Sequence, residues 1–279
     1  MSSVWNIEFK DVRMGHGDTV VLDQVSVTLP AGKISVILGG SGGGKSTMLR
    51  HIIGLSRPMA GKILLGGKDI FALPGRDFRM LRRRMGVLFQ DGALLGQLSV
   101  GQNVALPLSE HTKLPKHIIR EIVVHKLSLV GLGDFADYYP AELSGGMRKR
   151  AGLARALVTD PPILLCDEPT SGLDPISAAQ MDELLLDMKR QYPDMTIVSV
   201  SHDMASVKSV ADHVIVLRDG GIGYEGDLAG LESSADPYLR RFMDRTPVPE
   251  EDLRDPRRTL SEETRKLMHA SLDNWLDRG

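Results

Sequence analysis

The sequence contains one cysteine, Cys166, among 279 residues. A single cysteine excludes an intrachain disulfide framework and a cysteine-based metal cluster. Because Cys166 lies in an apolar run, we expect it to be a small buried core residue.

Long apolar runs are also lacking. The longest, such as 163–166 and 196–200, fall far short of the roughly 18 to 20 residues needed to cross a bilayer. No segment is therefore expected to span a membrane. The N-terminus carries acidic residues and lacks the apolar stretch of a secretory signal, so we expect a cytoplasmic location.

Neither sign of charge is in excess, because 34 Lys and Arg face 36 Asp and Glu, giving a net charge of −2. A sequence-independent nucleic-acid binder needs a strong basic excess to displace counterions from phosphates. Nucleic acid is therefore not an expected partner. A hydrophobic content of 42% is instead sufficient for a large globular core.

What the sequence does have is a regular alternation of apolar stretches and turn residues. Residues 4–38 read as strands that lead into a glycine-rich loop, and 45–53 has helical spacing and ends at Gly54. Residues 61–71 predict a hairpin and 84–90 a strand.

Residues 95–160 have helical character, with one apolar stripe after Pro115, and predict an inserted helical subdomain. Two strands, 163–167 and 196–201, then flank a helix at about 177–189, and a strand pair follows around 214–224. This alternation predicts an α/β fold with a parallel sheet. We expect one domain over 1–244, followed at 245–279 by a proline-containing linker and an amphipathic helix.

The glycine-rich loop, GGSGGGKST, matches the phosphate-loop pattern G-x-x-x-x-G-K-S. Its glycines let backbone N–H groups wrap phosphate oxygens, Lys45 neutralises β/γ-phosphate charge, and Ser46 ligates Mg²⁺. A chance glycine-rich turn is the alternative, but the strand before the loop and the helix after it favour a phosphate site. The expected nucleotide contacts are Gly39, Gly40, Ser41, Gly42, Gly43, Gly44, Lys45, Ser46 and Thr47.

Two carboxylates, Asp167 and Glu168, end the buried strand at 163–167. We expect Asp167 to face the magnesium ion and Glu168 to polarise a water that attacks the γ-phosphate. An acidic turn after a core strand is common, so this pattern carries weight only together with the phosphate loop.

A second anion site is predicted at Ser144, Gly145 and Gly146, which precede a helix. If one subunit's phosphate loop and another's Ser-Gly-Gly segment hold the same γ-phosphate, ATP joins a dimer. The alternative for this short motif is an ordinary helix N-cap.

These motifs, together with Gln90, SGLD at 171–174 and His202, resemble ABC-type nucleotide-binding domains over about residues 5–230. The resemblance implies a P-loop NTPase fold with an N-terminal antiparallel β-subdomain, and ATP and Mg²⁺ as cofactors. It also implies that Gln90 contacts magnesium and reports to a membrane partner. Asp174 would contact the opposite subunit, and His202 would hold the γ-phosphate and the catalytic water.

A narrower resemblance rests on LFQDGALL (88–95), NVALPLSEHTKLP (103–115) and Met147. These residues are similar to the Mla-type lipid transport ATPases, which work with an MCE-domain protein and a multispanning permease. The implied partners are a second copy of the chain, an integral membrane permease, an MCE-domain lipid-binding protein and a small cytoplasmic accessory domain. The implied place is the cytoplasmic face of the inner membrane.

Two other functions stay open: an ATPase for import of a small polar solute, and an ABC protein that works without a membrane partner. The base contacts are also open. Most ABC domains stack adenine on an aromatic residue near the first strand turn, but this chain offers Met14 and His16 there. Gly40 stands where proline is usual. A basic run, Arg79 and 82–84, either faces a membrane partner or is a solvated helix face.

Overall fold

The computed structural model describes residues 5–40 and 42–244. They divide into two compact units, one ending at Leu231 and the other beginning at Glu232. The sequence predicted a boundary after residue 244. In the structure, residues 232–244 group with the second unit instead of the first. The amphipathic helix predicted at 259–276 lies outside the described residues.

The first sheet is antiparallel, as expected for the N-terminal β-subdomain, and has the strand order β2-β1-β4-β5. Apolar residues alternate along its strands, so one face is buried. Its strands are β1 (Ile7–His16), β2 (Thr19–Leu29), β4 (Ala60–Leu65) and β5 (Lys68–Asp69).

The second sheet has the order β10-β9-β3-β8-β7-β6, with parallel pairing throughout except for the β9-β10 edge. Strands β3, β7 and β8 are buried almost along their whole length, as in a sheet covered on both faces. The strands are β3 (Ile34–Gly39), β6 (Met85–Leu88), β7 (Ile163–Asp167), β8 (Thr196–Val200), β9 (His213–Arg218) and β10 (Gly221–Gly226).

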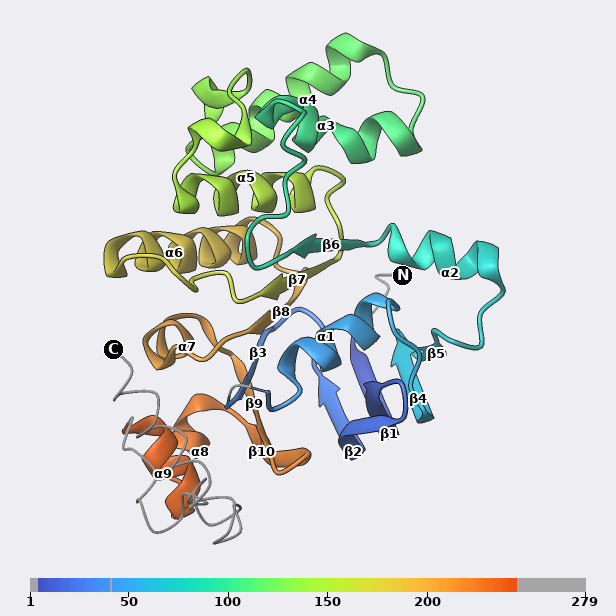
Figure 1. Ribbon diagram of the computed structural model, residues 1–279, viewed down its shortest axis with the longest axis vertical. Helices are drawn as coiled ribbons and strands as arrows, with labels where there is room; N and C mark the ends of the chain where they lie inside the picture. The colour runs from blue at the N-terminus through green and yellow to red at the C-terminus, as the bar shows by residue number, and fades with distance from the viewer. Residues whose placement is uncertain (1–4, 41, 245–279) are drawn as a thin grey trace, which may run out of the picture. The chain divides into compact units, whose positions relative to one another are not determined.

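Helix α1 (Lys45–Ile53) lies between the two sheets and contacts strands of both (Figure 1). Its Met48, Leu49 and Ile52 are buried in one continuous core with residues of both sheets. Because α1 begins where the glycine-rich loop ends, this core fixes the direction in which the helix N-terminus points.

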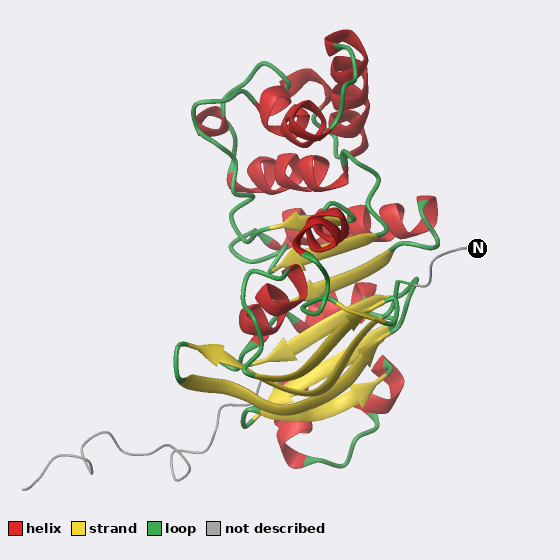
Figure 2. Cartoon of the chain, turned by 90° about the vertical axis from the view of Figure 1, so that its right-hand side faces the viewer, coloured by secondary structure: helices red, strands yellow, loops and turns green. Residues whose placement is uncertain are grey.

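Helices α3 (Val100–His111) and α4 (Lys116–Leu129) pack together and on α5 (Gly145–Leu157). They form the predicted helical subdomain, which Figure 2 shows apart from the sheets. The short 3₁₀ turns η1 (Gly133–Phe135) and η2 (Pro140–Glu142) connect α4 to α5. Helix α5 also packs on β6, where a side chain on Gly86 would meet the Ala156 carbonyl at 2.3 Å.

The remaining described helices are α2 (Gly75–Arg82), α6 (Pro175–Gln191), α7 (Met204–Val210), α8 (Leu228–Glu232) and α9 (Pro237–Met243). In residues 5–40 and 42–244, no helix has the length and apolar character required to cross a bilayer.

Candidate nucleotide site

The phosphate loop connects β3 to α1, the strand-loop-helix context that the motif requires. The Gly43 amide donates to the Gly40 carbonyl at 3.0 Å, which closes the loop on itself. Gly44 has φ 95°, and a Cβ there would lie 2.7 Å from Leu22 Cγ. Both the backbone angle and the buried Leu22 therefore require glycine. Ser41 lies outside the described residues.

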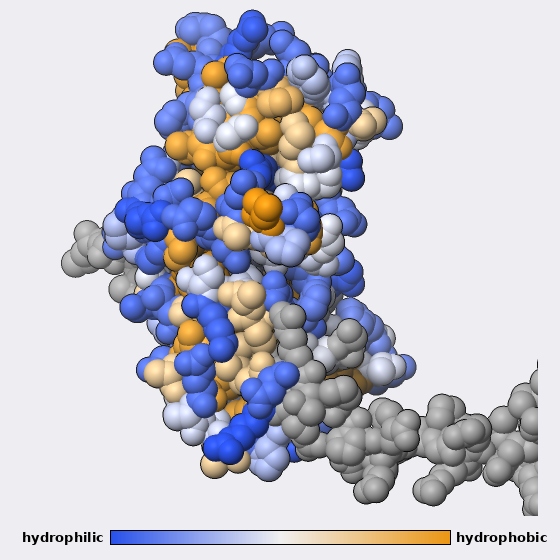
Figure 3. Space-filling view, turned by 90° about the vertical axis from the view of Figure 1, so that its left-hand side faces the viewer, coloured by the Kyte–Doolittle hydropathy of each residue, from blue (hydrophilic) through white to orange (hydrophobic). Residues whose placement is uncertain are grey.

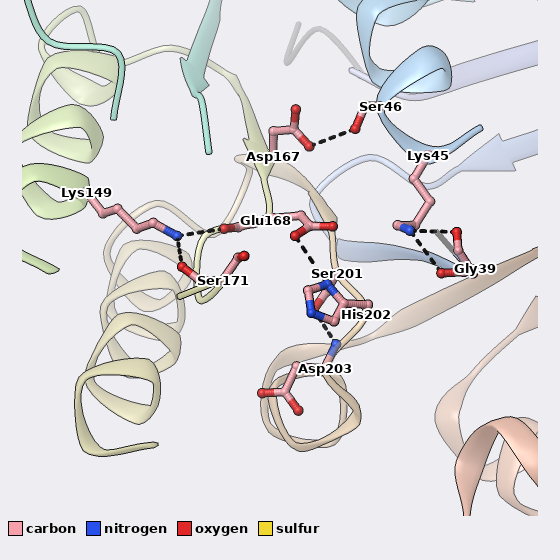
Figure 4. A network of polar contacts seen from close by, with 11 residues as sticks. Gly39, Lys45, Ser46, Lys149, Asp167, Glu168, Ser171, Ser201, His202 and Asp203 are labelled. Carbon is pink, nitrogen blue, oxygen red and sulfur yellow. Dashed lines mark hydrogen bonds and ion pairs between the residues drawn. The ribbon is translucent and has the colours of Figure 1, made fainter. Parts of the chain in front are cut away.

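The Lys45 side chain turns into the loop, where Nζ donates to the carbonyls of Gly39 at 2.9 Å and Gly40 at 3.0 Å (Figure 4). Burial lowers the pKa of this amine, and the charges of Glu168 and Asp167 oppose that shift. A bound phosphate would supply further oxygen acceptors to the same ammonium group.

The Ser46 hydroxyl donates to Asp167 Oδ1 at 3.3 Å, which brings the two predicted magnesium ligands together (Figure 4). Burial is the main cause of a raised pKa at Asp167. A half-buried carboxylate next to a hydroxyl fits Mg²⁺, which prefers oxygen ligands and would stabilise the ionised carboxylate. Gln90 follows β6 and is exposed, and its contact with magnesium stays a prediction.

Glu168 and His202 meet at the carboxyl ends of β7 and β8, where Glu168 Oε2 lies 3.2 Å from His202 Nδ1. The Glu168 side chain is 18% exposed and that of His202 is 59% exposed. Glu168 lines a pocket of about 260 Å³ together with Gly42, Gly43, Gly44, Lys45, Ser46 and Thr47. The predicted base and the phosphate loop thus face the same space.

The predicted adenine contacts separate into two groups. Met14 is fully buried in the hydrophobic core, so its prediction as a base contact is wrong. The reason is the strand pattern, in which Met14 continues the inward row of Val12. His16 at the end of β1 is exposed, and its Nε2 lies 3.3 Å from Thr47 Oγ1, beside the phosphate loop.

Ser144 and Asp174 are both helix N-caps. Ser144 Oγ accepts from the Met147 amide at 3.2 Å, and Asp174 Oδ1 accepts from the amides of Ile176 and Ser177. A hydrogen bond from the Ser177 side chain is the main cause of a lowered pKa at Asp174. The first turns of the two capped helices lie close together, since a Cβ on Gly146 of α5 would lie 3.9 Å from Ser177 Oγ of α6. Their contacts with an opposite subunit, and that of Gly145, stay predictions.

Two residues of α5 that the sequence reading missed hold the loops around this site. Lys149 Nζ donates to the Glu168 carbonyl, and the Arg155 guanidinium donates to the carbonyls of Gly92 at 2.9 Å and Ala93 at 2.7 Å. Lys149 belongs to a Met-Arg-Lys-Arg run that looks like a solvated basic face, and Arg155 follows that run on the same helix. No sequence signal marks either of them as a donor to these loops.

The model of the family described as ABC transporter matches residues 22–171, from Leu22 in β2 to Ser171. The chain belongs to the ABC transporter family. The match includes the phosphate loop, the Ser144–Gly146 segment, Asp167 and Glu168, and the fold with these loops is that of an ABC-type ATPase domain.

Curated relatives extend the comparison over 85% of the chain. The "Probable ribonucleotide transport ATP-binding protein mkl" of Mycobacterium tuberculosis is 44% identical, and this chain spans 66% of its length. The "Intermembrane phospholipid transport system ATP-binding protein MlaF" of Escherichia coli K12 is 41% identical, and 88% of it is covered.

Among solved structures, the ATP-binding cassette MJ0796 in a dimeric post-hydrolysis state bound to ADP and Pi is similar at a TM-score of 0.73 and 30% identity. The similarity covers 80% of this chain and 98% of that one.

Proposed function

We propose that this chain is the ATP-hydrolysing subunit of an ABC transporter that powers phospholipid transport between an inner and an outer membrane. The observation that carries the ATPase part is that Lys45, Ser46 and Glu168 line one pocket, with Asp167 accepting from Ser46 and His202 lying beside Glu168. The lipid cargo is supported by the similarity to MlaF.

The residues divide the chemistry of phosphoryl transfer among them. Lys45 and the loop amides hold the phosphates, and Ser46, Asp167 and Gln90 would hold Mg²⁺, which neutralises phosphate charge when bound. Glu168 accepts a hydrogen bond from the attacking water, and His202 next to it holds that water and the γ-phosphate. Positioning and charge neutralisation supply the acceleration, and no covalent intermediate is needed.

Replacing Glu168 with Gln tests the assignment of the base. The amide side chain keeps the size of the group but cannot accept a proton, so we expect ATP binding to persist and hydrolysis to fall by about 10²-fold or more. Binding is measured with a fluorescent ATP analogue and hydrolysis by phosphate release. Retained turnover in the Glu168→Gln variant would remove Glu168 from this role.

The ATP site is proposed to be completed by a second copy of the chain. Ser144, Gly145, Gly146 and Asp174 would then face the γ-phosphate bound to the partner's phosphate loop. A similar cassette is described as dimeric. The face drawn in Figure 3 carries patches of hydrophobic side chains among hydrophilic ones, and Ile176, next to the Asp174 cap, is 72% exposed.

The proposed permease contact is a groove of about 470 Å³ between α2, β6 and α3. Three of the four residues in the basic run, Arg79, Arg82 and Arg83, line it together with Leu55 and Phe89. Among residues 5–40 and 42–244, none of these arginines forms an ion pair with a carboxylate. An amphipathic cytoplasmic segment with acidic and apolar side chains fits such a groove.

The remaining partners follow from the proposed transporter: an MCE-domain lipid-binding protein and a small cytoplasmic accessory domain. The chain would then work at the cytoplasmic face of the inner membrane as a peripheral subunit. Purification of the assembly from membranes, followed by identification of its proteins and lipids, tests this set. Bound phospholipid and an MCE-domain protein would support it, and a ribosome or DNA would contradict it.

A second cargo class is supported by the similarity to the relative named for ribonucleotide transport. An ATPase subunit does not contact the cargo, so both classes fit the same site. Phospholipid in the purified assembly favours the first function, whereas a polar solute-binding protein without lipid favours the second.

A further inference from the structure

Lys149 is a buried cation that the proposed chemistry does not use. Its side chain lies on α5 and is 5% exposed. Nζ donates to the main-chain carbonyls of Glu168 at 3.0 Å and Ser171 at 2.5 Å. Figure 4 shows the side chain reaching from α5 across to the turn that carries Glu168.

The turn that Lys149 holds is a constrained one. Glu168 has φ 49°, a left-handed backbone conformation that is unfavourable for a residue with a side chain. The Ser171 amide donates to the Glu168 carbonyl at 3.2 Å, so the turn closes between these two residues. Lys149 bonds the carbonyl at each end. Its ammonium therefore fixes the main chain from which the Glu168 carboxylate projects.

Burial lowers the pKa of Lys149, while the charges of Asp91 and Glu168 oppose that shift. Removing an ammonium from water is unfavourable, and two carbonyl acceptors offset only part of that cost. An uncharged residue would fill this space without that desolvation cost if packing were the only requirement. We therefore attribute the buried lysine to its hydrogen bonds with the turn.

The same helix begins at the other anion site. Ser144 caps α5, and Lys149 lies five residues further along, about 7.5 Å up the axis of a continuous helix. A helix of this length moves as one body. A shift of its N-terminus toward a phosphate therefore also moves the base of the Lys149 side chain.

In the proposed dimer, Ser144 faces the partner's nucleotide and Glu168 acts on the chain's own nucleotide. We propose that Lys149 is a positioning residue that couples the two ATP sites, by tying the phosphate-binding end of α5 to the turn that aims Glu168. This inference rests on the proposed ATP-joined dimer. It predicts that nucleotide capture at one site improves the alignment of the Glu168 that acts at the other site.

The chain offers a matched control in Lys126 on α4. This lysine is also buried, at 3% exposure, and Nζ bonds Asp160 at 2.6 Å and the Tyr192 hydroxyl at 3.2 Å. It joins the helical subdomain to the sheet domain but contacts neither anion site. Replacing Lys126 therefore measures the effect of removing a buried lysine that has no contact with either anion site.

The experiment compares Lys149→Met, Lys149→Arg and Lys126→Met in the full chain. For Lys149→Met we expect unchanged affinity for a fluorescent ATP analogue, a fall in kcat of about 10- to 100-fold, and a Hill coefficient for ATP hydrolysis that falls to 1. Lys149→Arg keeps a cationic donor and should retain at least part of the wild-type kcat and of the wild-type Hill coefficient. Lys126→Met should lower the thermal midpoint but keep the wild-type Hill coefficient and kcat per folded molecule.

Wild-type kcat and Hill coefficient in folded Lys149→Met would overturn the coupling role, as would an equal loss in Lys126→Met. A failure of the proposed function itself would give different results. The wild-type chain would then not hydrolyse ATP, or the Glu168→Gln variant would hydrolyse ATP as fast as the wild type.

Discussion

Met14 and His16 stand two positions apart on β1 but have different surroundings. Met14 is part of the hydrophobic core, whereas His16 is exposed beside Thr47. His16 pairs with Thr19 next to the hairpin turn, where both residues are exposed. At this scale, stability and nucleotide binding can therefore be separated.

Met14→Ala is expected to lower the free energy of unfolding by about 2–5 kcal/mol, because it leaves a cavity in the core. His16→Ala should leave stability nearly unchanged and weaken nucleotide binding by about three- to tenfold, the loss of one modest polar contact. Urea unfolding and a fluorescent nucleotide titration measure the two effects. Met14→Leu is the control, since a swap of similar volume should cost less than about 1.5 kcal/mol. A larger affinity loss for folded Met14→Ala than for His16→Ala would reverse this assignment.

Much of the site could be predicted from sequence because each motif stays contiguous. Lys45, Ser46, Asp167 and Glu168 sit in short segments whose spacing reflects the strands and helix that carry them. Met14 was misassigned because it was chosen for its place near the first strand turn, although the alternation that it shares with Val12 already indicates an inward side chain. Lys149 was missed because its burial depends on the distant turn at Glu168, and a basic residue in a basic run is ordinarily solvated.

At the scale of elements, helices α6 and α7 are joined by a buried carboxyl group. Asp182 on α6 is 5% exposed and accepts a hydrogen bond from the Ser206 hydroxyl of α7 at 2.5 Å. Burial raises the pKa of Asp182, and this effect outweighs the opposing hydrogen bond. The folded chain thus holds the proton more tightly than the unfolded chain does.

This raised pKa gives the helix pair a pH dependence with a definite sign. Between the ordinary pKa of Asp and the raised pKa of Asp182 in the folded chain, the unfolded chain ionises first. The free energy of unfolding therefore falls as pH rises through this range, and the destabilising effect of Asp182 persists at higher pH. Asp182→Asn removes the titration and can still accept from Ser206. Its stability relative to the wild type should rise from acid to neutral pH, as urea unfolding at several pH values would measure.

Asp187→Asn is the control on the same helix, because Asp187 is exposed and its ion pair with Arg190 contributes little. A pH-independent difference between Asp182→Asn and the wild type would contradict the raised pKa.

The sequence also predicted most elements, because their apolar periodicity and bounding glycines and prolines are local. The strands from β1 to β10, helix α1 and helices α3 to α6 fall in or close to the predicted ranges, whereas no range was predicted for α2 or for helices α7 to α9. The unit boundary at Leu231 was not predicted, since the grouping of 232–244 depends on contacts in space rather than on composition.

At the scale of the whole molecule, Lys45 and the Ser144–Gly146 segment belong to different sites of the proposed dimer. A chain with Lys45→Ala and a chain with Gly145→Asp should each be nearly inactive. A Cβ at position 145 would meet only the end of the Arg148 side chain, at 4.0 Å, so the aspartate should affect the phosphate rather than the fold. A mixture of the two should regain part of the phosphate release, because mixed dimers contain one intact site but lack the alignment that nucleotide at the other site provides.

The matched control mixes Lys45→Ala with Glu168→Gln, both of which disable the site of the chain that carries them. Mixed dimers of that pair have no intact site, so no activity should return. An inactive mixture of Lys45→Ala and Gly145→Asp would show that each chain completes its own site.

The N-caps at Ser144 and Asp174 have a consequence for where ATP is consumed. Both capping groups form their hydrogen bonds within a single subunit. An isolated chain can therefore fold, but in the proposed dimer it lacks the second half of its ATP site. Hydrolysis by free chains should then rise with the square of their concentration. In the proposed transporter, two copies held on one permease would face each other at an effective concentration in the millimolar range, on the order expected for a short tether. Surplus subunits that have found no permease would stay idle, and the fold itself would confine ATP consumption to assembled transporters.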